Sequence, residues 1–217
     1  MKPQETGQSR MKLFSRLSVP IYVICSTVSA LLLSSTTHAG EPAFDCDKAD
    51  GQVQQLVCTD DGLASLDRQL ADVYRTALEN LPAAEVPTAK VTQRGWIKGR
   101  DDCWKADDTK QCVTEAYQMR IVQLQIISGQ LSAPTAVSLD CGDNEQAPFF
   151  AAFYNDTTPP AAVITRGQDQ VIAFVARSGS GARYTAQGVE FWEHQGQASI
   201  DWFGTKLLCS VGHTTQN

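Results

Sequence analysis

The spacing of apolar residues changes partway along the chain, and this change predicts an α part followed by a β part. Up to about Gly129, apolar residues recur three, four and seven positions apart, the period of an amphipathic helix. The pattern predicts a short helix over 52–58 and longer helices from Asp60–Asp61 to Asn80, over 87–104 and over 109–127. Because each helix has one apolar stripe, we expect them to pack together as a small bundle.

Aromatic and apolar residues of these helices are expected in the core of the bundle. The second long helix is predicted to bury Val91, Trp96 and Ile97. Core packing is also the simplest interpretation of Tyr74 and Trp104, since large aromatic side chains dominate small cores.

From Cys141 onward the chain has short alternating segments separated by turn residues. Strands are expected over 149–154, 161–165, 171–176, 183–187, 189–194, 197–202 and 206–209. Many short strands at this spacing favour a small antiparallel barrel or sandwich. The stretch between the two parts contains Gly, Pro, Ser and Thr and has no helical period. We therefore predict a helical domain over 40–129, a linker over 130–138 and a β domain over 139–217.

The first 39 residues resemble a secretory signal peptide. Lys12 and Arg16 precede an apolar stretch from Val19 to Leu33, and small residues precede Gly40. A membrane-spanning helix needs about 20 mostly apolar residues, so this stretch is too short to stay in a membrane. Lipid attachment at Cys25 is not expected, because Ile24 is too large for the usual lipidation motif. The prediction is a periplasmic protein without an integral membrane segment.

Six cysteines follow the predicted signal, and an even number in an exported chain indicates disulfide bonds. Fifteen pairings of six cysteines are formally possible. Pairing within each part of the chain favours Cys46–Cys58, Cys103–Cys112 and Cys141–Cys209. A zinc site is disfavoured, because the cysteines lack close spacing and the histidines are scattered. No metal or other cofactor is expected.

A Ser-Gly-Ser-Gly sequence at Ser178–Gly181 predicts a narrow exposed loop. Gly179 and Gly181 flank Ser180 and permit backbone angles that are closed to other residues. Arg183 and Tyr184 follow at once and supply a guanidinium and a phenol. A thin polar loop on a hairpin is suited to insertion into the cleft of another molecule.

The segment Ser180-Gly181-Ala182-Arg183-Tyr184, followed by Phe191-Trp192, resembles the bacterial inhibitors of C-type lysozyme, over residues 136–210. The resemblance implies a barrel of about eight strands, no enzymatic activity, and a serine that enters the lysozyme cleft and contacts the catalytic carboxylates; inhibition would protect the cell wall. Ser180 matches that serine, and we expect the loop around it to fill the cleft, so the predicted lysozyme-binding residues are Ser178, Gly179, Ser180, Gly181, Arg183, Tyr184 and His194. His194 stands where the family has a lysine.

The helical part resembles the LprI-type amino-terminal domain over residues 44–125. The pattern consists of the cysteines, Trp96 and helix-face residues in Leu66–Leu70, Arg100–Cys103 and Tyr117–Ile121. In some members this domain is associated with lysozyme inhibition.

The charge of the chain favours a basic partner. Of its 18 basic and 24 acidic side chains, four basic and one acidic lie in the predicted signal, and the remaining 14 and 23 give a net charge of −9. This argues against nucleic acid and anionic membranes as partners and favours C-type lysozyme, which is basic.

Two rival functions come from other classes. One is a glycan-binding module, in which Trp192, Trp202 and Tyr184 stack on sugars. The other is a hydrolase that uses Glu190 or Glu193 with His194. It is disfavoured because neighbouring strand residues point to opposite faces, so Glu193 and His194 cannot line one pocket.

Overall fold

The computed structural model describes residues 40–142 and 148–212 of the 217-residue chain. The predicted signal peptide, with Cys25, lies outside the described residues. Within them, no helix is long and apolar enough to pass through a bilayer.

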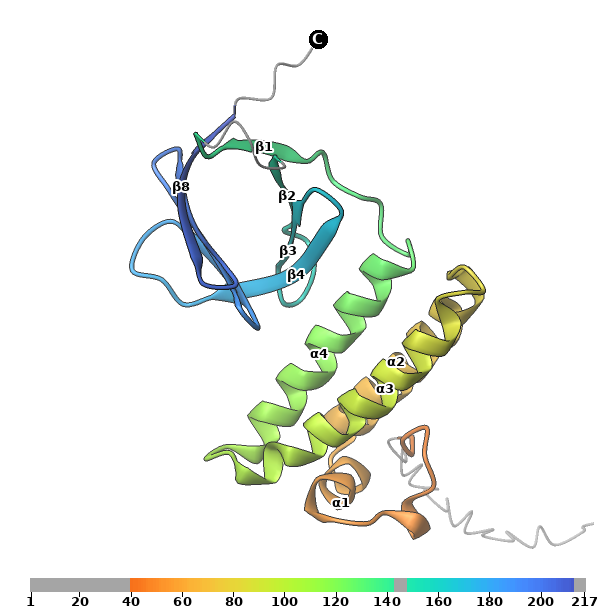
Figure 1. Cartoon of the computed structure of the whole chain (residues 1–217). Coiled ribbons are helices and arrows are strands. Elements are labelled where there is room, and N and C mark those ends of the chain that lie inside the picture. Colours follow the sequence, from red (N-terminus) through yellow and green to blue (C-terminus); the bar gives the residue numbers. More distant parts are fainter. Residues whose placement is uncertain (1–39, 143–147, 213–217) are drawn as a thin grey trace, which may run out of the picture. The chain divides into compact units, whose positions relative to one another are not determined.

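The helical part contains four α-helices among its described residues (Figure 1). Side chains of aspartates cap two of them: Asp60 accepts a hydrogen bond from the Leu63 amide at 3.0 Å, and Asp108 accepts one from the Gln111 amide at 2.9 Å. The helices are α1 (Gln52–Thr59), α2 (Asp61–Asn80), α3 (Val86–Asp101) and α4 (Thr109–Ile127), with 3-10 turns η1 (Cys46–Lys48) and η2 (Asp102–Lys105).

The core of the helical part forms where α1, α2 and α3 pack on α4. Val57, Leu63, Val113, Tyr117 and Leu124 are fully buried there. Disulfides Cys46–Cys58 and Cys103–Cys112 join η1 to α1 and η2 to α4. Each closes a short loop, so the chain-entropy model assigns each about 3 kcal/mol of stability.

The buried face of α3 differs from the prediction. Val91 and Ile97 are exposed, whereas Ala89, Gln93, Trp96 and Arg100 form the inward stripe. This stripe also has helical spacing, but half of its members are polar, so apolar residues alone identified the wrong face.

Trp104 is likewise exposed, which contradicts its predicted place in the core. It belongs to the turn η2, where the helical period no longer determines which side chains face inward. The ammonium group of Lys105 lies 5.5 Å from the centre of its ring.

The carboxy-terminal part is a closed antiparallel barrel of eight strands in sequential order, as the fold-class prediction required (Figure 1). The pairing of Leu139 with Val211 joins the first strand to the last. Closure leaves the barrel without a free sheet edge. The strands are β1 (Val137–Asp140), β2 (Phe149–Tyr154), β3 (Ala161–Arg166), β4 (Asp169–Ala176), β5 (Ala182–Ala186), β6 (Val189–His194), β7 (Gln197–Trp202) and β8 (Thr205–Val211).

Alternate residues of these strands fill the barrel interior. Phe149, Ile164, Phe191 and Ile200 are almost or fully inaccessible to solvent. The disulfide Cys141–Cys209 connects the segment after β1 to β8 across 68 residues of sequence. For a loop of that length the chain-entropy model assigns about 4 kcal/mol.

Strand β1 was not among the predicted strands, and its first two residues, Val137 and Ser138, fall inside the predicted linker. The strand has four residues, too few for alternation to be recognised. Its extended conformation depends on hydrogen bonds to β2 and β8.

Candidate functional site

The loop between β4 and β5 places Ser180 at its exposed tip. Hydrogen bonds hold its backbone: the Ser180 carbonyl accepts one from Ser178 Oγ at 2.6 Å and one from Trp192 Nε1 at 2.9 Å. Ser178 Oγ also lies 3.0 Å from the Gly181 carbonyl. Among the described residues, Ser180 Oγ has no hydrogen-bond partner. The loop therefore presents one free hydroxyl on a backbone that is held in place.

Gly181 is the residue that allows the loop to lie directly against β6. Its φ is +69°, and a Cβ placed there would come within 2.1 Å of the Glu193 carbonyl oxygen and 3.1 Å of His194 Cβ. Gly179 differs: its φ is not positive, and a Cβ there would have no atom within 4 Å. The expectation of a special conformation on both sides of Ser180 is correct for Gly181 and wrong for Gly179.

Trp192 and His194 project from the outer face of β6 beside the loop. Their rings stack with centres 6.3 Å apart and planes 24° apart. Trp192 is 40% exposed, so it forms part of the surface while its indole N–H anchors the loop. His194 is exposed and lies next to Gly181. The structure thus brings Ser180, Trp192 and His194 together on one surface.

Arg183 lies on this outer face but is engaged by its neighbour. It pairs with Trp192 across the sheet, and its guanidinium forms an ion pair with Glu190 of β6. Its Nε is buried without a hydrogen-bond partner among the described residues. Part of its charge is therefore already neutralised by Glu190.

Tyr184 faces the barrel interior and is only 5% exposed. Its ring packs against Phe153 and Phe191, and its hydroxyl donates to Asn155 Oδ1 at 3.4 Å. Burial raises the pKa of the phenol. Tyr184 and Glu193 line a cavity of about 270 Å³ at the barrel mouth. The Tyr184 ring therefore contributes almost nothing to the outer surface of the barrel in this structure.

Both parts of the chain match models of lysozyme-inhibitor families. Residues 46–128 match the model described as lysozyme inhibitor LprI, and residues 140–208 match the membrane-bound lysozyme inhibitor of c-type lysozyme. Proteins named lipoprotein LprI from Mycobacterium tuberculosis and Mycobacterium bovis are 40% identical over 191 residues, which cover 84% of this chain and 95% of theirs. The chain belongs to the LprI family. No match to a solved structure was found.

Both resemblances predicted from the sequence are confirmed by these matches, in the predicted order. The LprI-family relatives are named lipoproteins, which is consistent with an envelope or secreted location for this chain as well. The absence of a lipid at Cys25 stays a prediction.

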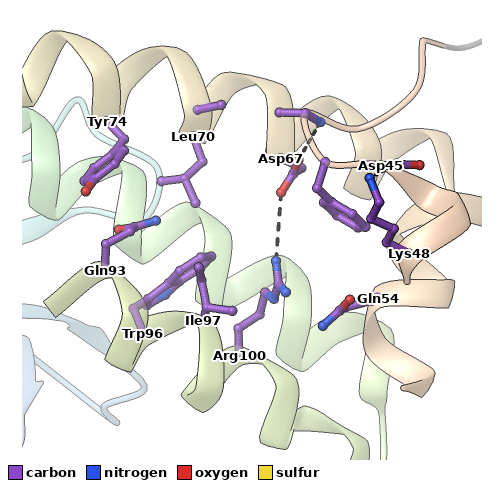
Figure 2. A pocket seen from close by; sticks show the side chains of 13 residues that line it. Asp45, Lys48, Gln54, Asp67, Leu70, Tyr74, Gln93, Trp96, Ile97 and Arg100 are labelled. Carbon is purple, nitrogen blue, oxygen red and sulfur yellow. Dashed lines mark hydrogen bonds and ion pairs between the residues drawn. The ribbon is translucent and has the colours of Figure 1, made fainter. Parts of the chain in front are cut away.

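The LprI-type part contains a buried polar cluster to which the sequence analysis assigned no role (Figure 2). Asp67 Oδ1 accepts a hydrogen bond from the Tyr117 hydroxyl at 2.8 Å, and Oδ2 accepts one from the Ala43 amide at 2.7 Å. Arg100 Nη1 donates to the same hydroxyl at 2.6 Å. It also lies 3.9 Å from Asp67 Oδ1, the pair that a dashed line joins in Figure 2. Burial raises the pKa of Tyr117. The sequence feature that could have indicated this cluster is Asp67 itself, because it is a charged residue on the apolar stripe of α2 between Leu63 and Leu70.

Proposed function

We propose that this LprI-family chain inhibits C-type lysozyme by inserting the loop Ser178–Tyr184 into the active-site cleft. The observation that carries the proposal is the free hydroxyl of Ser180 at the tip of a loop held by Gly181 and Trp192. Matches of both parts of the chain to lysozyme-inhibitor families support lysozyme as the partner.

The chemistry of the cleft suits such a loop. Lysozyme cleaves its polymer with two carboxyl groups on either side of the scissile bond. A serine hydroxyl can donate a hydrogen bond to one carboxylate, and a hydrogen bond to a charged group contributes about 1.5–3 kcal/mol. Because the loop is already fixed by Ser178 and Trp192, little conformational entropy is lost on binding. Inhibition would be steric and electrostatic, with no covalent step.

The remaining predicted site residues take different roles in this proposal. Ser178 and Gly181 shape the loop, and His194 lies beside it on the surface that meets lysozyme. Arg183, which is held in place by its ion pair with Glu190, would contribute a polar group at the edge of the surface that meets lysozyme. Tyr184 supports β5 from the barrel interior.

The rest of the molecule is consistent with an envelope inhibitor. The net charge of −9 after removal of the predicted signal would attract a basic enzyme and speed encounter. We assign the protein to the periplasm, with a helical domain over 40–129 and an inhibitor domain that begins with β1 at Val137, two residues before the boundary predicted from the sequence.

The glycan-binding alternative loses most of its candidate residues. Of its three aromatic side chains, Trp202 and Tyr184 are buried inside the barrel, and only Trp192 is available at the surface. A sugar platform usually needs more than one exposed ring.

Removing the Ser180 hydroxyl tests the proposed contact. Ser180→Ala is expected to weaken inhibition of lysozyme about tenfold or more, because a hydrogen bond to a carboxylate is lost. The measurement is the inhibition constant in a cell-lysis assay. Thr205→Ala, which removes an exposed hydroxyl at the opposite end of the barrel, is the matched control and should have no effect. Equal inhibition by Ser180→Ala and the unchanged protein would exclude the serine contact.

The histidine in place of the family lysine predicts pH-dependent inhibition. Histidine side chains generally gain a positive charge as pH falls below about 6.5, whereas lysine stays charged throughout. On the outer face of β6, Trp192 stacks on His194, and the neutral Gln197 is its partner on β7, whereas Glu193 points to the barrel interior. In the proposed complex the charges that face His194 would therefore be the lysozyme carboxylates. Inhibition should therefore strengthen as pH falls from 8 to 6.

Inhibition constants across this pH range provide the check. The inhibition constant of His194→Lys should depend less on pH than that of the unchanged protein. Any pH dependence that comes from lysozyme itself affects both proteins, so the His194→Lys curve serves as the reference. Parallel profiles for the two proteins would place His194 outside the contact.

A further inference from the structure

The helical part contains a pocket of about 480 Å³ between α2 and α3, which both pack on α4. Figure 2 shows Tyr74 and Gln93 at one end of the pocket, Asp67 and Arg100 in the middle, and Asp45, Lys48 and Gln54 at the other end. Leu70, Trp96 and Ile97 are among the residues that line it, and the lining is mainly apolar. Pockets of this size and lining are typical of small-molecule sites.

A buried guanidinium is hydrogen-bonded to one of the residues that line this pocket. Arg120 of α4 is 5% exposed, and its Nε donates at 2.9 Å to Oε1 of Gln93, which lines the pocket. Its Nη1 has only a long contact to Gln123, at 3.4 Å, and its Nη2 is buried with no hydrogen-bond partner in the described part of the chain. No carboxylate within the described residues forms an ion pair with it. The charge of Arg120 is thus unneutralised.

The other buried arginine of the helical part shows what Arg120 lacks. Arg100 uses its Nε and Nη2 to hold the Asp101 carboxylate, at 2.9 and 2.7 Å. These two nitrogens form the edge of a guanidinium that binds a carboxylate side-on. In Arg120 the same edge has one donor on the neutral amide of Gln93 and one donor with no acceptor. A buried cation in this state is costly, and burial lowers its pKa.

We propose that the pocket between α2 and α3 binds a small amphiphilic carboxylate. Its apolar body would lie against Leu70, Tyr74 and Trp96. Its carboxylate would replace the Gln93 amide on Arg120 and accept hydrogen bonds from both Nε and Nη2. The carboxylate end is assigned to Arg120 because Arg100 is already neutralised by Asp101 and Asp67. This site is separate from the barrel loop and does not depend on its proposed role.

Decanoate is a suitable probe, since it combines an apolar chain with one carboxylate. Isothermal titration calorimetry on the full protein, below the concentration at which decanoate forms micelles, should show saturable binding at one site. Decanol and decylammonium have the same chain without the negative charge and should bind at least tenfold more weakly. Equal binding of the three compounds, or no binding of decanoate at millimolar concentration, would overturn the proposal.

Arg120→Met separates binding from a structural role. It removes the charge and keeps an apolar side chain of similar length, so the melting temperature should stay the same or rise while decanoate binding falls at least tenfold. Arg75→Met removes an exposed arginine of α2 and should leave binding unchanged. Binding by Arg120→Met within twofold of the unchanged protein would also overturn the proposal.

A second variant covers the case in which Arg120→Met fails to fold. Ala71→Phe fills the pocket from α2 and leaves Arg120 in place, so it should also abolish decanoate binding. Undiminished binding by a folded Ala71→Phe protein would place decanoate outside this pocket.

Discussion

Replacing Gly181 with alanine is expected to weaken inhibition of lysozyme more than a hundredfold. The new Cβ would lie 2.1 Å from the Glu193 carbonyl oxygen, which is backbone and cannot rotate away, and φ of +69° is unfavourable for alanine. Residue 181 must therefore leave its position against β6. This movement breaks the hydrogen bond between Trp192 Nε1 and the Ser180 carbonyl and displaces the hydroxyl by more than its hydrogen bond tolerates.

The matched control is Gly179→Ala, two residues earlier in the same loop. A Cβ at position 179 would meet nothing within 4 Å, so inhibition should stay within twofold of the unchanged protein. Inhibition constants of the two variants in the same lysis assay measure the difference, and near-ultraviolet circular dichroism verifies that the barrel is folded. Similar inhibition by both variants would show that the shape of the loop does not determine binding.

Replacing Asp67 with alanine is expected to lower the free energy of unfolding by about 3 kcal/mol, because a buried, hydrogen-bonded carboxylate next to a buried arginine is lost. The Ala43 amide loses its acceptor, and the Tyr117 hydroxyl keeps only its bond from Arg100. Arg100 retains Asp101, so the cost should stay below that of leaving a buried charge entirely unpaired.

Asp72→Ala on the same helix is the control for this change. Asp72 forms an ion pair with Arg75 at 3.0 Å, but both side chains are largely exposed, and exposed pairs contribute about 0–1 kcal/mol. Urea denaturation with the disulfides intact measures both variants. A loss for Asp67→Ala no larger than for Asp72→Ala would mean that the buried cluster does not stabilise the helical part.

Much of the architecture could be predicted because the signals were local. The helical period identified the helices, and alternation between turn residues identified seven of the eight strands. Strand β1 was not predicted, because it has only four residues and its extended conformation depends on pairing with β2 and β8. The buried face of α3 was predicted wrongly because polar residues take two of its inward positions, and Trp104 was predicted wrongly because it lies in the turn η2, outside the helical period.

The amino-acid sequence by itself determined the order of an α part and a β part, the family resemblance and the loop around Ser180. Each depends on residues close together in the chain. Only the tertiary structure decided that Gly181 and not Gly179 is constrained, that Tyr184 points into the barrel, and that Arg120 lacks the carboxylate that Arg100 has. The physical reason is that these properties depend on contacts between segments distant in sequence, such as the loop with β6 and α4 with α3, which no local pattern encodes.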